Sequence, residues 1–225
     1  LVRDAMENGA MGLSTGLIYS PATFADRNEL VELCKVVAEF GGFYVTHMRN
    51  ESDFVVESVE EALDIGRRSG AGVWISHHKM CGPKNWGKSR ETLHLIEEAR
   101  AEGMDVTLDH YPYTANMTNL NIPIPPKYFD KGGIDGVVKL LGTPEGRASI
   151  RADMEREDCG YDNFYQSAGG WQGVLISGCP DVPEADGMTV AEYAKRIGKD
   201  PCEAYFDLIE KSAGRANGVY SKKKK

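Results

Sequence analysis

Two histidines follow short apolar runs of the sequence and stand thirty positions apart. His47 ends the run "FYVTH", and His77 comes two residues after "VWI". If the two runs are adjacent parallel strands, the imidazoles lie near one another, and two neutral imidazoles can hold one zinc ion at ~2.0–2.1 Å. The alternative is a pair of core histidines that bond to the backbone. Because two strands end in this way, we favour the metal site over a pair of core histidines.

A lysine close to the second histidine could bind an anion. Because side chains alternate along a strand, His78 is expected to face away from His77, while Lys79 returns to the His77 side. Lys79 could hold a substrate carboxylate as a point charge, or it could be a solvated lysine at the rim of the fold.

Two tyrosines and an acid complete the polar residues at strand ends. Tyr19 and Tyr111 could orient a carbonyl or stabilise an oxyanion, or they could be amphipathic residues at the edge of the core. Asp109 is expected to be an acid that supports the site residues from behind or a structural acid. No phosphate-binding loop and no nucleophile elbow occurs in the sequence.

These side chains need a repeated architecture to bring them together. Short β-branched and aromatic runs alternate with amphipathic helical patterns at about thirty residues per unit, which is typical of βα units and a parallel sheet. In such folds the functional site gathers at the carboxyl ends of the strands. The expected strands are 11–19, 42–49, 71–79 and 104–113, and the expected helices between them are 26–42, 52–70 and 89–103.

The alternation of strands and helices ends near residue 120, where a proline-rich stretch cannot form a regular helix. The sequence then predicts helices joined by long loops and one strand, at 171–179. We therefore expect an α/β fold with three regions. These are the central βα units of a barrel (1–119), an insertion with helices and one strand (120–220), and a disordered lysine tail (221–225).

Composition narrows the class of protein. The formal net charge of -8 argues against broad nucleic-acid binding. No apolar stretch reaches the ~20 residues that a membrane span needs, and we expect no membrane partner. Five cysteines without a C-x-x-C pair favour a reducing compartment, so the expected location is the cytoplasm.

Several stretches together resemble the D-aminoacylase group of the amidohydrolase superfamily, the N-acyl-D-amino-acid deacylases. They are "GAMGLSTGLIYSPATFADRNELVELCKVVAEFGGFYVTHMRNE", "ISHHK", "NWGKS" and "DHYPYTAN". The resemblance implies part of a metal-dependent (β/α)₈ TIM-like barrel, about four βα units plus a helical insertion. It implies zinc as cofactor, His47 and His77 as metal ligands, and substrate contacts from Tyr19, Lys79 and Tyr111.

The implied reaction is hydrolysis of the amide of an N-acyl-D-amino acid to the D-amino acid and a carboxylate. The family's H-x-H, its bridging cysteine and its catalytic aspartate have no counterpart in these 225 residues. We therefore expect a fragment that is inactive alone and contains no certain catalytic residue.

Two alternatives stay open. One is a cyclic amidohydrolase related to dihydropyrimidinase or dihydroorotase. The other is a non-catalytic half-barrel that acts only in an assembly, through self-association or with the missing half of the barrel.

Overall fold

The structure is a computed structural model that describes residues 1–221 of the chain. The chain divides into two compact units. Residues 1–80 and 85–112 form unit 1, and residues 81–84 with the chain from 113 onward form unit 2. Residues 222–225, in the lysine tail, lie outside the described residues. Among the described helices, none is long and apolar enough to cross a membrane.

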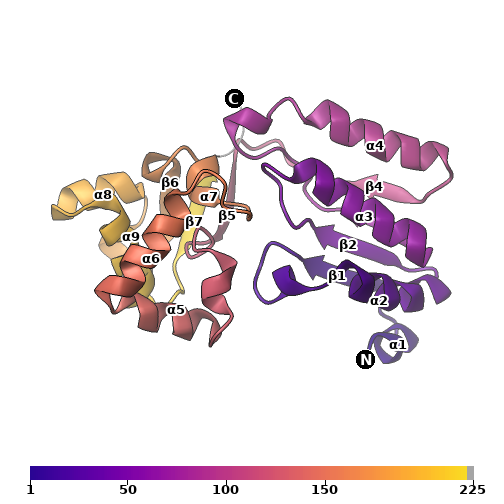
Figure 1. Ribbon diagram of the computed structural model, residues 1–225, viewed down its shortest axis with the longest axis horizontal. Helices are drawn as coiled ribbons and strands as arrows, with labels where there is room; N and C mark the ends of the chain where they lie inside the picture. Colours follow the sequence, from indigo (N-terminus) through magenta and orange to yellow (C-terminus); the bar gives the residue numbers. More distant parts are fainter. Residues whose placement is uncertain (222–225) are drawn as a thin grey trace. The chain divides into compact units, whose positions relative to one another are not determined.

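Unit 1 contains a four-stranded sheet in the order β1-β2-β3-β4, with every neighbouring pair parallel. Helices connect the strands, so the predicted series of four βα units is confirmed (Figure 1). The strands are β1 Gly12–Gly16, β2 Phe43–His47, β3 Gly72–Ile75 and β4 Val106–Leu108, and the helices are α1 Val2–Glu7, α2 Arg27–Glu39, α3 Val55–Ser69 and α4 Ser89–Ala101. Short 3₁₀ helices occur at Ala22–Phe24 and Pro83–Asn85.

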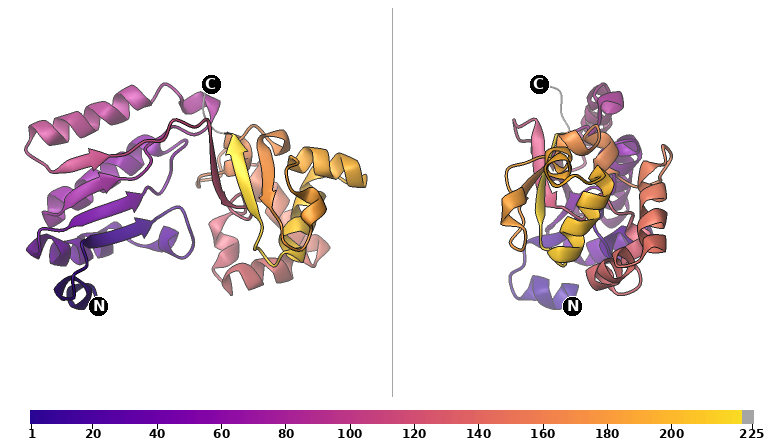
Figure 2. Two further views of the ribbon diagram at one scale, coloured as in Figure 1. Left: turned by 180° about the vertical axis from the view of Figure 1, so that it is seen from behind. Right: turned by 90° about the vertical axis from the view of Figure 1, so that its left-hand side faces the viewer.

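The two faces of the parallel sheet differ in character. Along β2 every second residue is buried, and of these Tyr44 belongs to the hydrophobic core that the helices cover. Tyr44 and Val73 are register partners on that covered face and are fully buried. Val45 and Trp74 are partners on the other face, where Trp74 is 40% exposed. The view from behind in Figure 2 shows the strands in front of the helices.

Two glycines allow close packing within unit 1. A Cβ atom at Gly12 would lie 2.0 Å from the carbonyl oxygen of Phe43, so only glycine lets β1 approach β2 there. A Cβ atom at Gly66 on α3 would lie 2.2 Å from Met104 Cε and 2.5 Å from Val73 Cγ2. The helix therefore packs onto the sheet at a distance that a larger side chain would increase.

Unit 2 is built on an antiparallel sheet in the order β5-β7-β6 (Figure 2). The sequence predicts one strand in this region, at the position of β6, whereas the described residues of unit 2 form three. The pairing of β7 with two neighbours stabilises the segment "NGVYS", in which Asn and Gly have low strand propensity. The strands are β5 Ala115–Asn119, β6 Val174–Gly178 and β7 Asn217–Ser221. The helices are α5 Gly133–Leu141, α6 Pro144–Glu155, α7 Phe164–Ser167, α8 Val190–Ile197 and α9 Pro201–Lys211, with 3₁₀ helices at Pro126–Phe129, Trp171–Gly173 and Pro183–Ala185.

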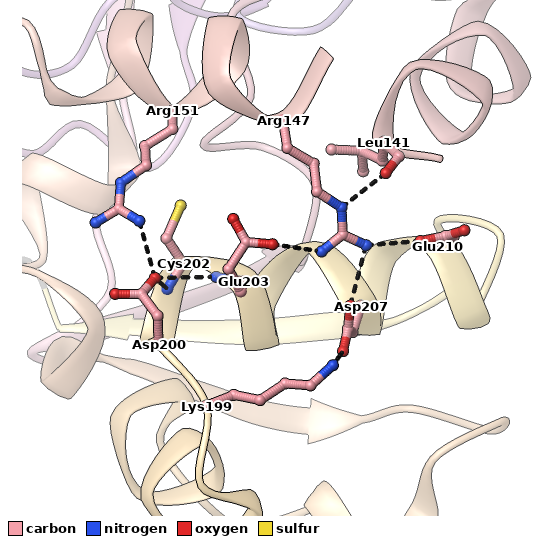
Figure 3. Close-up of polar contacts among 9 residues, drawn as sticks. All are labelled: Leu141, Arg147, Arg151, Lys199, Asp200, Cys202, Glu203, Asp207 and Glu210. Atoms are coloured by element: carbon pink, nitrogen blue, oxygen red, sulfur yellow. Dashed lines mark hydrogen bonds and ion pairs between the residues drawn. The ribbon is translucent and has the colours of Figure 1, made fainter. Parts of the chain in front are cut away.

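An ion-pair network joins α6 to α9 in unit 2 (Figure 3). Arg147 donates to Glu203 at 2.7 Å, to Asp207 at 3.0 Å and to Glu210 at 2.7 Å. Its Nε also donates to the carbonyl of Leu141 at 2.7 Å. Because one guanidinium serves three carboxylates of the same helix, α6 and α9 are held together by polar as well as apolar contacts.

Candidate metal centre

His47 is the last residue of β2 and lies on the face of the sheet that the helices leave uncovered. It follows Val45 by two positions, so strand alternation gives both side chains the same direction. The side chain is 14% exposed. Its ring therefore stands at the carboxyl edge of the sheet, where parallel strands usually present functional groups.

His77 reaches the same place by a different route. β3 ends at Ile75, and His77 has φ of +40°, a left-handed conformation that is uncommon outside glycine. The register partner of His47 would be Ser76, because Thr46 pairs with Ile75. The turn, rather than strand alternation, brings the His77 ring to within 4.5 Å of the His47 ring, centroid to centroid.

Asp109 supports this turn from the end of β4. Its Oδ1 accepts a hydrogen bond from the backbone N–H of His77 at 2.7 Å, and its Oδ2 accepts one from Trp74 Nε1 at 2.6 Å. The backbone N–H of His78 donates to the carbonyl of Asp109 at 2.9 Å. The structural role expected for this acid thus takes a definite form, which is to hold the left-handed residue in place.

His78 points to the opposite side, among the helices. It is buried, and its Nε2 lies 3.0 Å from Thr92 Oγ1 on α4. The left-handed turn at His77 separates the directions of the two neighbouring histidines. His78 is therefore a structural residue in the packing of α4 on the sheet.

The loop after β2 carries the acid of the site. The sequence favours Ser52 or Asp53 as the start of the next helix, whereas α3 begins at Val55. Asn50 causes the delay, because its Oδ1 accepts from the backbone N–H groups of Ser52 at 2.9 Å and Phe54 at 3.0 Å. Side chains of Asn and Asp commonly bind nearby backbone in this way instead of continuing a helix.

Arg49 anchors the other end of that loop. Its guanidinium donates to Glu61 at 2.9 Å and to the carbonyl oxygens of Thr23 at 2.6 Å and Ala25 at 3.1 Å. Because Arg49 and Asn50 are fixed, the next residue, Glu51, is held close to the two histidines.

Glu51 is the centre of the cluster. Its side chain is fully buried, at 0% exposure, and its Oε2 lies 3.7 Å from His47 Nε2. His77 Nδ1 lies 3.1 Å from Oε1, and Lys79 Nζ lies 2.6 Å from the carboxylate. Burial alone would raise the pKa of Glu51, but the charges of His47 and Lys79 and the hydrogen bond with His77 hold that pKa well below its usual range. Glu51 is therefore an anion inside the protein.

His47, Glu51 and His77 can serve as a set of metal ligands. Each offers one donor atom, and these atoms all lie within 4.8 Å of one another. Imidazole nitrogen and carboxylate oxygen are donors that zinc accepts in proteins. The donor set present in unit 1 thus fits a divalent metal ion.

The other three residues predicted at the site surround this cluster. The Tyr19 ring lies 5.3 Å from the His47 ring, and the Tyr111 ring lies 6.4 Å from the His77 ring. Lys79 Nζ stands 5.5 Å from the Tyr111 ring centroid. However, the Lys79 side chain is only 2% exposed and is paired with Glu51. Lys79 is therefore a buried lysine and not a solvated one at the rim of the fold, and its predicted contact with substrate stays a prediction.

Sequence reasoning assigned no role to Glu51. The only signal for it is its position, four residues after His47 in the loop at the carboxyl end of a strand. Its burial depends on the folding of the loop by Arg49 and Asn50, which local sequence does not reveal.

No protein-family model matches the chain. The chain is 49% identical over 120 residues to a D-aminoacylase from Alcaligenes xylosoxydans xylosoxydans, which covers 53% of this chain and 25% of that protein. It is 48% identical over 120 residues to an N-acyl-D-glutamate deacylase from the same organism, with the same coverage. The chain thus spans about a quarter of the length of these curated relatives.

Solved structures resemble the chain over almost all of its length. The N-acyl-D-glutamate deacylase of Bordetella bronchiseptica, in complex with zinc and a phosphonate inhibitor, superposes with a TM-score of 0.74 and 32% identity. The similarity covers 99% of this chain and 37% of that protein. A crystal structure of D-aminoacylase gives a TM-score of 0.67 and 33% identity, with 99% and 36% covered.

Proposed function

Because the chain is related to the N-acyl-D-amino-acid deacylases of the amidohydrolase superfamily, we propose that it is part of a zinc-dependent amide hydrolase. The reaction is hydrolysis of an N-acyl-D-amino acid to the D-amino acid and a carboxylate. The observation that carries this proposal is the close approach of His47 and His77, whose rings lie 4.5 Å apart at the carboxyl ends of adjacent strands.

In this proposal His47 and His77 hold the zinc ion. When bound, zinc supplies Lewis acidity for the attack of water on the amide carbonyl. Tyr19 and Tyr111 flank the histidines and help to position the substrate, and Lys79 supplies a positive charge for the α-carboxylate. Asp109 keeps His77 in the direction that metal binding requires.

The curated relatives differ in the acyl-amino acid that their names give. D-aminoacylase, N-acyl-D-glutamate deacylase and N-acyl-D-aspartate deacylase are 49%, 48% and 43% identical to this chain over 120 to 123 residues. The proposal is therefore kept to the class of N-acyl-D-amino acids and to no particular side chain.

Zinc titration of the 225-residue chain tests the metal part of the proposal. We expect stoichiometric binding that His47→Ala and His77→Ala weaken, whereas His94→Ala, which removes a solvent-exposed histidine on α4, leaves it unchanged. Equal affinity in all variants would contradict the metal site.

Ligand binding tests the substrate part. We expect N-acetyl-D-methionine to raise the melting temperature of the zinc-loaded chain, and its L enantiomer to have little effect. Acetate release is followed in the same samples. Equal stabilisation by both enantiomers would contradict a site for D-amino acids.

We also infer that β1 and β4, the two edges of the parallel sheet in the described residues, pair with further strands of a barrel or of a second copy. Light scattering of the chain, which reports its mass in solution, tests this. A cytoplasmic location is supported by the cysteines, which form no disulfide in the part of the chain that the structure describes. Fractionation of the native cell checks that location.

A further inference from the structure

The connection between β1 and α2 carries Tyr19, one of the residues proposed to meet the substrate. This loop runs from residue 17 to residue 26 and, apart from the short 3₁₀ helix Ala22–Phe24, forms neither helix nor strand. The centroid of the Tyr19 ring nevertheless lies 5.3 Å from that of His47. A residue on such a loop holds one position only if neighbouring elements fix the loop.

Tyr19 folds back over the end of β1. A Cβ atom at Gly16 would lie 3.0 Å from Cδ2 of the Tyr19 ring, so glycine leaves room for the ring at this position. Gly16 and His47 are register partners in the sheet. The ring therefore lies against the backbone of β1 and beside the last residue of β2, and a displacement of the loop would separate it from His47.

Arg49 holds this loop from the end of the neighbouring strand. It lies two residues beyond His47, and its guanidinium donates to the carbonyl oxygens of Thr23 at 2.6 Å and Ala25 at 3.1 Å. The backbone N–H of Thr23 donates in turn to the carbonyl oxygen of Tyr19 at 2.8 Å. Arg49 is therefore linked through one residue to the backbone of Tyr19.

Glu61 on α3 orients the guanidinium. Its carboxylate accepts from Arg49 Nε at 2.9 Å and from Arg49 Nη2 at 2.9 Å. The Glu61 side chain is 9% exposed, so this partner is itself fixed by packing. Paired donation of this kind is a property of the planar guanidinium, and a lysine ammonium cannot reproduce it. Because one edge of the guanidinium lies on Glu61, its other N–H groups are directed at the loop.

We propose that Arg49 is a positioning residue for substrate binding, which keeps the Tyr19 ring beside His47 by fixing the loop that carries it. The inference rests on the proposed function, in which Tyr19 helps to position the substrate. Arg49 acts through Tyr19 and makes no contact of its own with the substrate. Removing its hydrogen bonds therefore moves Tyr19 and leaves the core of unit 1 in place.

The position of the Tyr19 ring can be measured without metal or ligand. The tyrosines of the 225-residue chain are replaced by 3-fluorotyrosine, and the fluorine resonances of Tyr19 and Tyr44 are assigned with phenylalanine variants. Tyr44 is fully buried in the core of unit 1 and reports the fold. Arg49→Lys keeps the charge but loses the planar set of donors. We expect it to move the Tyr19 resonance toward its value in urea, while the Tyr44 resonance stays in place.

Two further variants complete the comparison. Glu61→Gln weakens the support of the guanidinium, so we expect a smaller shift of the Tyr19 resonance in the same direction. Arg67→Met removes an exposed arginine of the same helix, and we expect no shift. An unmoved Tyr19 resonance in Arg49→Lys, or equal displacement of the Tyr19 and Tyr44 resonances, would overturn the inference. If Arg49→Lys does not fold, Glu61→Gln decides by the same criterion.

Binding of N-acetyl-D-methionine to the zinc-saturated chain tests the consequence for the substrate. We expect Arg49→Lys to raise Kd roughly 5-fold, within the range of coupling between residues of one network. In a Tyr19→Ala background the same change should cost nothing further, because the effects of residues that act through one another are not additive. Equal costs in the two backgrounds, or a loss of zinc affinity without a loss of ligand affinity, would show that Arg49 does not act through Tyr19.

The outcomes separate this inference from the proposed function. If the wild-type chain with zinc does not bind N-acetyl-D-methionine, the substrate part of the proposed function is wrong, and the fluorine resonances decide whether Arg49 positions Tyr19. If the ligand binds and Arg49→Lys leaves its Kd unchanged, the proposed function stands and the inference is wrong. If Kd rises and the Tyr19 resonance moves while that of Tyr44 does not, both stand.

Discussion

Asp109 Oδ1 accepts the backbone N–H of His77 at 2.7 Å, and His77 has a positive φ. A left-handed conformation of a residue with a side chain costs roughly 1–2 kcal/mol. The hydrogen bond from Asp109 offsets that cost at the one position where the turn directs a ring toward His47. The orientation of the His77 ring, a proposed metal ligand, therefore depends on the Asp109 carboxylate at the end of the neighbouring strand.

Asp109→Ala should weaken zinc binding without removing any proposed ligand. The variant loses the acceptor for the His77 N–H, so the turn relaxes and the ring leaves its position near His47. We expect ~10-fold lower zinc affinity, comparable to the loss of other groups that orient ligands. Asp109→Asn keeps an acceptor for the His77 N–H but loses the one for Trp74 Nε1, so it should recover only part of the affinity. A full loss with Asn as well as Ala would indicate that the charge, rather than the hydrogen bond, is needed.

Thr92→Val should separate the structural histidine from the metal site. It removes the hydroxyl that contacts His78 Nε2 at 3.0 Å and conserves the volume of the side chain. Because only one partner of this buried hydrogen bond is removed, the free energy of unfolding in urea should fall by about 1–3 kcal/mol. Zinc affinity should stay at the wild-type value. A large loss of zinc affinity would mean that His78 belongs to the site.

Arg147→Met should destabilise unit 2 more than the loss of an exposed arginine. Arg147 has a side chain 18% exposed, and its removal leaves Glu203, Asp207 and Glu210 without their shared cation. We expect a loss of about 2 kcal/mol, between the values typical of exposed and of buried ion pairs. The control is Arg156→Met, whose side chain is 65% exposed, and urea denaturation of both variants makes the comparison. Equal losses in the two variants would contradict the importance of the network.

The same network predicts a dependence of stability on acid. Burial would raise the pKa of Asp207, but hydrogen bonds and charges from Lys199 and Arg147 lower it below its ordinary value of 3.8 (Figure 3). A carboxyl group with a lowered pKa contributes stability above its unfolded pKa, and the contribution is lost as the pH falls through the folded pKa. Unfolding free energies measured from pH 5 down to pH 3 should therefore fall less steeply in Asp207→Asn than in the wild type. Parallel curves would exclude Asp207 as a source of the dependence.

The arrangement of the βα units was predictable because local signals and tertiary structure agree there. Asp26 accepts from the N–H of Asn28 at the start of α2. In unit 2, Thr189 and Asp200 likewise cap α8 and α9. These features depend on neighbours in the sequence, which is why sequence alone reveals them.

The site was less predictable because its geometry comes from loops. Alternation along a strand predicts a partner for His47, but the structure brings His77 there by a left-handed turn that Asp109 supports from another strand. Glu51 is placed by a hydrogen bond that Asn50 Oδ1 accepts from the Ser52 N–H and by one that Arg49 donates to the Thr23 carbonyl, 26 positions away. Likewise, β7 becomes a strand because β5 and β6 pair with it. Contacts between distant segments leave little trace in local residue patterns.

The proposed ligands and their neighbours, from Tyr19 to Tyr111, all belong to unit 1. Binding to a folded site stabilises only the part of the chain that contains it, by ~2.7 kcal/mol when the free ligand exceeds Kd a hundredfold. In a calorimeter, zinc should therefore shift the heat-absorption peak of unit 1 to higher temperature and leave that of unit 2 in place. If the two units instead unfold in one transition, zinc would shift that single peak. Comparing the traces recorded with and without zinc therefore shows whether the two units unfold as one thermodynamic unit.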